Sequence, residues 1–434
     1  MFFFLFHVFF IQKISPYVTH SAPRECVKYF VPGKIGHGFG IGAVEKLDAE
    51  DEDVYVGLCR QFLTKVSTRS GIGNEACIPV SLQHIPPVAS MKHYIEEIET
   101  VLFTVAEELL GKQKVSPKLI DIVIINCGAF SPTPSVTSMI INKYGLRSNV
   151  MSFCLTGMGC SAGLISVGLA NDLLKVHKNS LALILSMETM TPNAYTGQNK
   201  SMLLSNVIFR MGGAGCLLSN RKQDMYKNKA KYALQHLVRT SRASDDQSHN
   251  SVVQELDDDG IVGILLSPSL LQVASSALRI NITKLGPLVL PYTEQLQYGW
   301  SIICRKFWVS QKRKDVYAPD FKKAFQHFCI HAGGRAVIDA MEDSLSLCDE
   351  DGEPSRMTLY RFGNTSSSSL WYELAYLEAK GRVKRGDRVW QIGFGSGFKC
   401  NSAVWKCVSD LDPDTKNAWS DRIHLYPVDS VASM

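Results

Sequence analysis

The sequence SFCLTGMGCSAG, at residues 152–163, is the stretch that says most about the fold of this 434-residue chain. A strand-like run at 149–154 leads into a Gly-x-Gly turn, and the residues after Cys160 continue as a predicted helix to about 176. The glycines in the turn permit a sharp reversal and close backbone packing. A strand that enters a helix through a tight turn is typical of an α/β fold with a mostly parallel sheet.

The segments that precede this turn show the same alternation. Apolar residues recur every three or four positions through 91–111, which predicts an amphipathic helix that ends at Gly111. Runs rich in Ile, Val and Leu at 119–126 and 180–186 predict buried strands. Two further helices are predicted, at 52–66 and within 131–145.

A second series of elements follows two polar stretches, 221–230 and 244–260, which are predicted as loops. The alternation then restarts, with predicted elements at 269–280 (helix), 327–331 (strand), after Gly334 (helix) and at 388–394 (strand). No repeat of fixed period is visible. Both series contain apolar strands that end in Gly-rich turns, so we predict two similar α/β halves divided near residue 225.

Composition narrows the class of protein. Hydrophobic residues make up 45% of the chain and charged residues 20%, which excludes a disordered chain. The formal net charge is +5, and no Lys/Arg-rich block with interleaved aromatic residues occurs, so the sequence gives no support for nucleic-acid binding. The 12 cysteines include no CxxC pair, which argues against zinc ribbons and thioredoxin-type redox motifs and fits a reducing compartment.

The first eleven residues, MFFFLFHVFFI, form the only strongly membrane-like segment. A helix that spans a bilayer needs about 20 apolar residues, so this run is too short. It lacks a preceding basic residue and a nearby small-x-small cleavage pattern, so it does not match a signal peptide. We interpret residues 1–22 as a short apolar leader that acts as an interfacial anchor or as the remnant of a longer segment.

Cys160 is the strongest candidate for a nucleophile. A thiol at the start of a helix feels the positive end of the helix dipole, which favours the thiolate. The neighbouring backbone N–H groups could also stabilise an oxyanion during acyl transfer. Most cysteines are buried and structural, which is the alternative here and the expected role of Cys154 on the strand. The strand–turn–helix setting favours a nucleophile at Cys160.

A nucleophilic cysteine needs a base or an electrostatic partner, and the best candidates lie in HFCIHAGGR at 327–335. His331 ends an apolar strand and meets a Gly pair, a position that directs a side chain into a site. His327 is a weaker catalytic candidate, because it could equally be a core histidine. A zinc site is the other reading of the HxxxH spacing, but the Glu of metalloprotease helices and a nearby third ligand are missing.

A neutral hydrogen-bond donor is available at Asn364, within RFGNTSSSS at 361–369. An Asn-Thr-Ser sequence more commonly marks a helix N-cap, so the catalytic reading depends on the combination with Cys160 and His331. The sequence GFGSGF at 393–398 resembles a dinucleotide loop, but the third Gly of GxGxxG would fall at Phe398. We therefore predict a tight loop that lines a site.

These motifs together resemble those of the plant 3-ketoacyl-CoA synthases, the condensing enzymes of fatty-acid elongation. The resemblance covers roughly residues 69–430 and includes, in order, RSGIGNE, NKYGLRSN, GMGCSAG, FRMGGAG, LGPLVLP, HFCIHAGGRAVID, RFGNTSSSSLWYELAY and GSGFKCNSAVW. The resemblance implies a thiolase-like α/β fold with a duplicated five-layer core, normally a homodimer. The N-terminal half would be 23–225, with the nucleophilic Cys, and the C-terminal half 226–434, with the His and the Asn.

The resemblance also implies a reaction. Cys160 would accept an acyl group from a long-chain acyl-CoA as a thioester. His331 and Asn364 would hold the thioester carbonyl of malonyl-CoA and stabilise the enolate left by loss of CO₂, and the enolate would attack the acyl group to give a 3-oxoacyl-CoA. The family pattern includes His327 as well. No metal or cofactor is expected beyond the two CoA substrates.

The sequence departs from the family in three respects. Ser241 and Tyr360 stand where many members have histidine, and members usually begin with two membrane-spanning helices where this chain has the apolar run at 1–11. The family implies association with the endoplasmic reticulum membrane and contacts with the ketoreductase, dehydratase and enoyl reductase of the elongase. Two alternatives stay open: a condensing enzyme like the type III polyketide synthases, and a weakly active subunit that regulates an elongase.

Overall fold

The computed structural model describes residues 54–83, 89–221, 230–307 and 317–428. The predicted leader at 1–22 and the predicted boundary near 225 lie outside these residues. Within the described ranges, no helix has both the length and the apolar character needed to cross a bilayer. The architecture is α/β, as predicted, with two four-stranded sheets and a separate two-stranded one.

The first sheet has the strand order β2-β1-β3-β4. Its strands are β2 (Met151–Leu155), β1 (Ile122–Asn126), β3 (Leu181–Met187) and β4 (Gly213–Ser219). The first three are parallel, with Ile122 opposite both Met151 and Ala182, and β4 pairs with β3 in the antiparallel direction. The predicted strands at 119–126, 149–154 and 180–186 are therefore confirmed and form one sheet.

The second sheet has the order β5-β10-β9-β8 and is built entirely from residues after the segment 222–229. Its strands are β5 (Tyr232–Ser241), β10 (Lys399–Cys407), β9 (Arg388–Gly395) and β8 (His327–Ile330). β8 and β9 run parallel, and β10 is antiparallel to both β9 and β5. The two predicted strands at 327–331 and 388–394 are confirmed, while the division into two domains near 225 stays a prediction.

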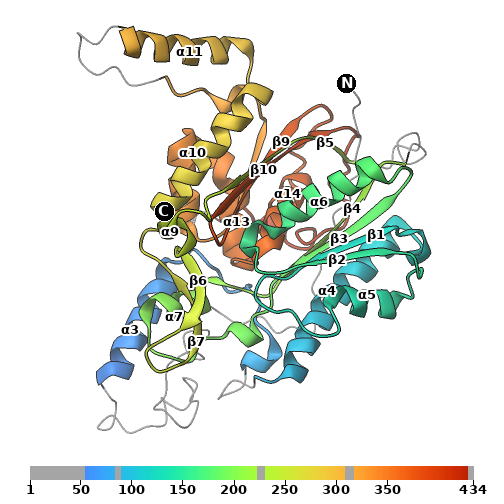
Figure 1. The fold of residues 1–434 in the computed structure, drawn as a ribbon, viewed down its shortest axis with the longest axis vertical. Coiled ribbons are helices and arrows are strands. Elements are labelled where there is room, and N and C mark those ends of the chain that lie inside the picture. Colours follow the sequence, from blue (N-terminus) through green and yellow to red (C-terminus); the bar gives the residue numbers. More distant parts are fainter. Residues whose placement is uncertain (1–53, 84–88, 222–229, 308–316, 429–434) are drawn as a thin grey trace.

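Helices separate and cover these sheets, so that five layers follow one another (Figure 1). The outer face of the first sheet carries α4 (Met91–Gln113) and α5 (Val136–Tyr144). Between the sheets lie α6 (Ala162–Val176) and α14 (Ser369–Ala379). The outer face of the second sheet carries α10 (Leu270–Val289), against which α12 (Arg335–Leu345) packs. This is the five-layer order that the resemblance implied.

Alternation along the strands explains why both faces of each sheet are covered. Ile122 and Ile124 point toward α6, in the core between the sheets, whereas Val123 and Ile125 point toward α4. All four are fully buried. A parallel strand buried on both faces reads as a continuous apolar run, which is why the sequence IVIIN was recognisable.

One prediction was wrong. The polar stretch at 244–260 contains the short helix α9 (Asp246–His249) and the strand β6 (Val252–Leu256), which forms a hairpin with β7 (Val262–Leu266). The hairpin lies outside the two main sheets, and much of β6 is exposed. In β6 only Val252 and Val253 are half-buried, and the following Gln254, Glu255 and Leu256 are exposed, so the strand lacks the continuous apolar run of a buried strand.

The remaining helices lie around the layers. They are α3 (Val54–Arg69), α7 (Lys200–Ile208), α11 (Tyr292–Phe307) and α13 (Asp349–Phe362). α3 confirms the helix predicted at 52–66, and it packs against α7. α4 runs two residues beyond the predicted end at Gly111, because Lys114 adopts the left-handed conformation (φ 51°) that closes the helix.

Two glycines of α6 provide a test of the packing between the layers. A Cβ atom at Gly163 would lie 2.5 Å from the carbonyl oxygen of Ser367, whereas at Gly168 it would make an ordinary contact of 3.6 Å with Arg239. We expect Gly163→Ala to lower the free energy of unfolding by about 1–3 kcal/mol through steric overlap. Gly168→Ala should leave it unchanged or raise it by up to about 1 kcal/mol, because Ala is the better helix former.

Equilibrium unfolding in urea would measure both variants. A Gly163→Ala protein as stable as Gly168→Ala would show that α6 and the backbone at Ser367 are not packed as closely as described.

Candidate active site

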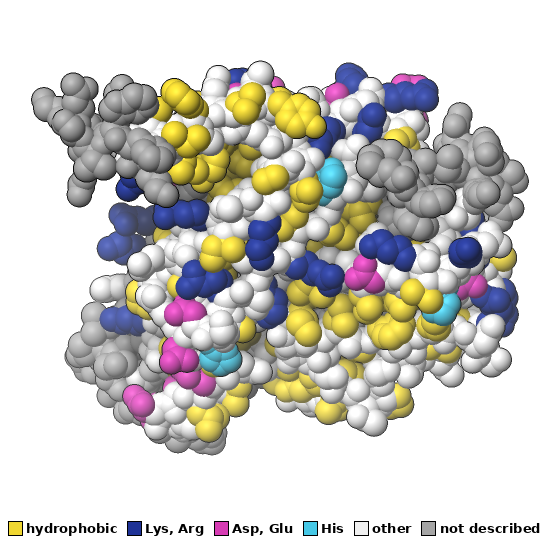
Figure 2. All heavy atoms as spheres, turned by 45° about the horizontal axis from the view of Figure 1, so that its top comes forward, with side chains coloured by type: hydrophobic (Ala, Val, Ile, Leu, Met, Phe, Trp, Pro, Cys, Tyr) yellow, Lys and Arg dark blue, Asp and Glu magenta, His cyan; other side chains and the backbone are white. Residues whose placement is uncertain are grey.

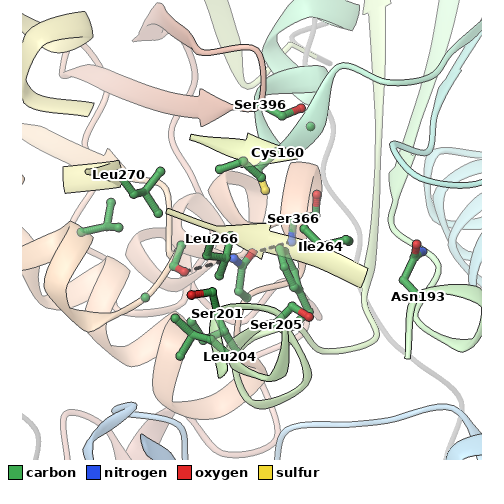
Figure 3. Close-up of a pocket in the computed structure, with 18 of the residues that line it drawn as sticks. Cys160, Asn193, Ser201, Leu204, Ser205, Ile264, Leu266, Leu270, Ser366 and Ser396 are labelled. Atoms are coloured by element: carbon green, nitrogen blue, oxygen red, sulfur yellow. Dashed lines mark hydrogen bonds between the residues drawn. The ribbon is translucent and has the colours of Figure 1, made fainter. Parts of the chain in front are cut away.

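A cavity of about 990 Å³ lies beside Cys160, and its lining also includes His331 and Asn364. The structure therefore brings together three of the four residues predicted from the sequence, although they come from widely separated parts of the chain. The loop at 393–398 contributes Phe394, Gly395 and the three residues that follow, as predicted for a loop that lines a site. Figure 3 shows Cys160 in this pocket with its sulfur directed toward Ser366.

The carboxyl ends of parallel strands supply most of the polar groups. β1 leads to Gly128, β2 leads to the turn with Cys160, β3 leads to Glu188, and β8 leads to His331. Ligands in α/β sheets bind outside the carboxyl ends of the strands, where loops and helix N-termini converge. The pocket therefore lies where the topology predicts a site.

The Cys160 turn has the conformation that its glycines were expected to permit. Cys160 lies on the 3₁₀ turn η3 (Gly159–Ser161), directly before α6. Gly157 and Gly159 have φ values of +66° and +62°, in the left-handed region. A Cβ at Gly159 would lie only 2.5 Å from the backbone nitrogen of Ser396, so this position also requires glycine for close approach.

The protonation state of Cys160 differs from the sequence-based expectation. Burial raises the pKa of the thiol to about 12, and the negative charge of Glu188 acts in the same direction, against a hydrogen bond with Ser366. Desolvation of the charged form thus outweighs the helix N-terminus, which was expected to favour the thiolate. The resting thiol is protonated and must lose its proton when a substrate reacts.

His331 is held rigidly at the end of β8. It is 4% exposed, and its backbone N–H donates to the carbonyl of Ile392 at 3.0 Å. Its Nδ1 lies 2.7 Å from the hydroxyl of Ser369, so Nε2 is the nitrogen available to a ligand. Burial lowers the pKa of His331 to about 4, and the ring is therefore neutral at pH 7 and able to accept a proton.

Asn364 is fixed through both its backbone and its side chain. Its backbone N–H donates to Ile208 at 3.1 Å and its carbonyl accepts from Arg210 at 2.9 Å. The side-chain Nδ2 donates to Gly333 at 3.1 Å, and Oδ1 accepts from the backbone of Ser366 at 2.8 Å (dashed lines in Figure 3). An amide nitrogen carries two hydrogens, so a second one can serve a ligand.

Sequence reasoning missed two residues of the site, Glu188 and Ser366. The Glu188 carboxylate accepts from the backbone of Gly128 (3.1 Å) and Ala129 (2.9 Å), and from the Ser366 hydroxyl (3.3 Å). Burial raises the pKa of Glu188 above its usual value. A lone Glu after a strand is no motif, but its place at the carboxyl end of β3, beside the end of the parallel strand β1, is a topological signal that was available.

The other positions singled out from the sequence lie outside the lining of the pocket. His327 begins β8, and its Nε2 lies 3.0 Å from the Asp387 carboxylate; a catalytic role for His327 stays a prediction. Ser241 ends β5 and is exposed. The Tyr360 ring packs edge-on against Tyr426. Cys154 packs against the core, as expected.

Much of the remaining lining is apolar. It comes from α3, α7, β7 and α10 and includes Phe62, Val66, Leu204, Ile264, Leu266 and Leu270. Figure 3 labels the last four of these residues. The lining also contains cationic side chains, namely Lys65, Arg69, Lys200 and Arg335. Such a chamber suits a ligand with a hydrocarbon part and an anionic part.

Comparison with known proteins agrees with this arrangement. Residues 44–307 match the family described as FAE1/Type III polyketide synthase-like protein, and residues 322–407 match the C-terminal domain of 3-oxoacyl-[acyl-carrier-protein] synthase III. The chain is 60% identical over 364 residues to 3-ketoacyl-CoA synthase 7 of Arabidopsis thaliana, a match that covers 84% of this chain and 78% of that protein. It is 57% identical over 368 residues to 3-ketoacyl-CoA synthase 5 of the same plant, with 85% and 74% covered.

Solved structures share the fold at low sequence identity. PKS-I from the brown alga Ectocarpus siliculosus has a TM-score of 0.66 at 16% identity, over 93% of this chain and 99% of that one. A type III pentaketide synthase from Neurospora crassa has a TM-score of 0.62 at 18% identity, with the same coverage. These likenesses support the fold alone.

The protonation state of Cys160 can be measured by alkylation with iodoacetamide, followed by peptide mass spectrometry. Because only the thiolate reacts, we expect the rate at Cys160 to rise about tenfold per pH unit between pH 7 and 9, without a plateau. Glu188→Gln removes a negative charge that raises the thiol pKa, so it should speed alkylation at pH 9 by about two- to tenfold.

Asp172→Asn, on the exposed face of α6, is the matched control and should leave this rate unchanged. A plateau below pH 8, or slower alkylation in Glu188→Gln, would contradict this account of the thiol.

Proposed function

The chain belongs to the 3-ketoacyl-CoA synthases, the condensing enzymes of very-long-chain fatty-acid elongation, and from this premise we propose how its pocket carries out the reaction. As such it is an acyltransferase that joins a long-chain acyl-CoA to malonyl-CoA. The observation that carries the proposal is the convergence of Cys160, His331 and Asn364 on one largely apolar pocket.

The first step is the transfer of the acyl group to Cys160. The thiol sulfur attacks the thioester carbonyl of the acyl-CoA, the bond from that carbonyl to the CoA sulfur breaks, and a Cys160 thioester forms. His331 is neutral and takes the thiol proton at Nε2, then returns it to the CoA thiolate. The raised pKa of Cys160 means that proton removal accompanies attack.

The second step makes the carbon–carbon bond. Malonyl-CoA loses CO₂, and the electron pair of the broken bond passes to its thioester carbonyl as an enolate. This step uses the neutral Nε2–H tautomer of His331, in which Nδ1 accepts from the Ser369 hydroxyl. His331 Nε2 and Asn364 Nδ2 then donate hydrogen bonds to the enolate oxygen. The enolate carbon attacks the acyl group on Cys160, the carbon–sulfur bond breaks, and the thiolate takes up one proton. The products are 3-oxoacyl-CoA, CO₂ and CoA, with no cofactor beyond the CoA substrates.

The pocket lining supports substrates of this class. The apolar side chains from α3, α7, β7 and α10 would hold the hydrocarbon chain, and the cationic ones would face the phosphates of CoA. We further propose a homodimer at the endoplasmic reticulum membrane, working with the ketoreductase, dehydratase and enoyl reductase of the elongase. These proposals rest on the family.

A panel of acyl-CoA primers with radiolabelled malonyl-CoA tests the activity. We expect extension of saturated C16–C22 primers, with a loss of at least about 10³-fold in Cys160→Ala, because no covalent acyl carrier remains. Folded protein that extends none of these primers would overturn the proposal and favour a regulatory subunit. Extension of aromatic or short primers alone would favour an activity like that of the type III polyketide synthases.

The role of Asn364 can be separated from that of the nucleophile. Asn364→Asp keeps the acceptor for Ser366 but removes the N–H donor and places an anion near the enolate. We expect release of ¹⁴CO₂ from labelled malonyl-CoA to fall by about 10²–10³-fold, the usual effect of losing an oxyanion-hole donor.

Asn171→Asp, on α6 and outside the pocket lining, is the matched control for this substitution. Unchanged ¹⁴CO₂ release in Asn364→Asp would remove Asn364 from the mechanism.

A further inference from the structure

Helix α11 (Tyr292–Phe307) lies apart from the layered core. It follows α10 after a short break at Leu290 and Pro291, and it projects from the top of the molecule in Figure 1, away from both large sheets. Most of its residues up to Arg305 are exposed. Two features of α11 therefore need an explanation: the contacts that hold it to the rest of the chain, and the apolar side chains that it exposes to solvent.

The attachment is polar and uses one side of the helix. Glu294 is fully buried, and its carboxylate accepts from the Tyr317 hydroxyl (2.7 Å) and from the backbone of Asp320 (2.9 Å), and forms an ion pair with Lys323. Two turns further along the helix, the Ser301 hydroxyl accepts a hydrogen bond from the backbone N–H of Tyr317 at 3.2 Å. Residues seven positions apart lie on the same face of a helix, so this face is fixed to the chain at 317–323.

The opposite face is apolar and open. Tyr292, Leu296, Trp300 and Ile303 are exposed by 83, 73, 62 and 47% respectively. Their spacing of four, four and three places them on one stripe of the helix, and at about 100° per residue this stripe lies opposite Glu294 and Ser301. Figure 2 shows hydrophobic side chains gathered at the upper left, at the α11 end of the molecule, with Lys and Arg side chains nearby.

We propose that this apolar stripe of α11 is a membrane-docking surface that lies in the interface of an anionic lipid bilayer, at a site separate from the apolar run at 1–11. An amphipathic helix with Trp, Tyr and aliphatic side chains on one face and cationic neighbours inserts its apolar face about 5–10 Å into the headgroup boundary. Sixteen residues are too few to span a bilayer, so the helix lies on it.

Charge and shape favour a bilayer over a protein partner. The described cationic residues near α11 lie on its polar side. At 100° per residue Arg305 shares the face of Glu294, and Lys322 and Lys323, 41% and 51% exposed, belong to the attached segment, where they form ion pairs with Asp351 and Glu294. In sequence, Lys306 within α11 and the KRK run at 312–314 add four more basic residues to this part of the chain. Helices that lie in an anionic membrane interface carry Lys and Arg on the polar face, where these side chains attract the headgroups.

The contact area points the same way. A 16-residue helix is about 24 Å long, and a stripe about 10 Å wide on it covers roughly 240 Å². A stable protein–protein interface buries about 800 Å² on each partner, so the stripe is too small for a dimer contact of its own. A projecting ridge fits a deformable, flat lipid surface better than it fits a protein groove.

Hydrogen exchange on the full chain, with and without lipid vesicles, tests the proposal. In the presence of 3:1 phosphatidylcholine–phosphatidylserine vesicles, we expect the amides of 292–303 to exchange at least about tenfold more slowly, and less slowing with phosphatidylcholine alone. The double variant Leu296→Asp, Ile303→Asp should abolish this protection. Val176→Asp and Leu425→Asp change residues that are just as exposed elsewhere and should keep it.

Four outcomes would overturn the proposal. The first is that the chain fails to bind vesicles, the second that it binds them while α11 exchanges as in solution, and the third that the double variant is protected as well as the native chain. The fourth outcome is protection that grows with protein concentration without vesicles, which would favour a contact with a second copy. The condensation assay is independent of these measurements, so either proposal can fail without the other.

Discussion

The close contact between the Cys160 turn and the loop of Asn364 is the constraint on which the site depends. α6 begins where Gly163 leaves no room between its backbone and the carbonyl of Ser367, and the turn before it presses on Ser396. Gly163 lies on the helix between β2 and β3 of the first sheet, whereas Ser367 and Ser396 come from the later part of the chain, which forms the second sheet. Without that contact, the thiol and the amide would not face one pocket.

The same contact removes water from the reacting groups, and this sets their protonation states. Burial raises the pKa of Cys160 and lowers that of His331, so that both are neutral at rest. Cys160 and His331 line the same pocket, so neutral His331 can take the thiol proton when the sulfur attacks the thioester carbonyl of a bound substrate. Glu188 adds negative charge on the thiol side and helps to keep Cys160 protonated.

The sequence predicted those parts of the molecule that leave a periodic or motif-like trace. The buried strands of the first sheet, the amphipathic helix α4 and the Gly-x-Gly turn were all recognisable, because full burial imposes apolar runs and a left-handed turn requires glycine. Strand β6 left no such trace, since most of it faces solvent. Glu188 and Ser366 were missed because their role comes from adjacency in space, and the high pKa of Cys160 because burial cannot be read from a motif.

The central claim is that Cys160 carries the acyl group. It is tested most directly by incubating the full-length protein with palmitoyl-CoA in the absence of malonyl-CoA, followed by peptide mass spectrometry. The account predicts one palmitoyl group, bound as a thioester on the peptide that contains Cys160. A palmitoyl group on another cysteine, such as the exposed Cys348, or no acylation of a folded and substrate-bound protein, would contradict it.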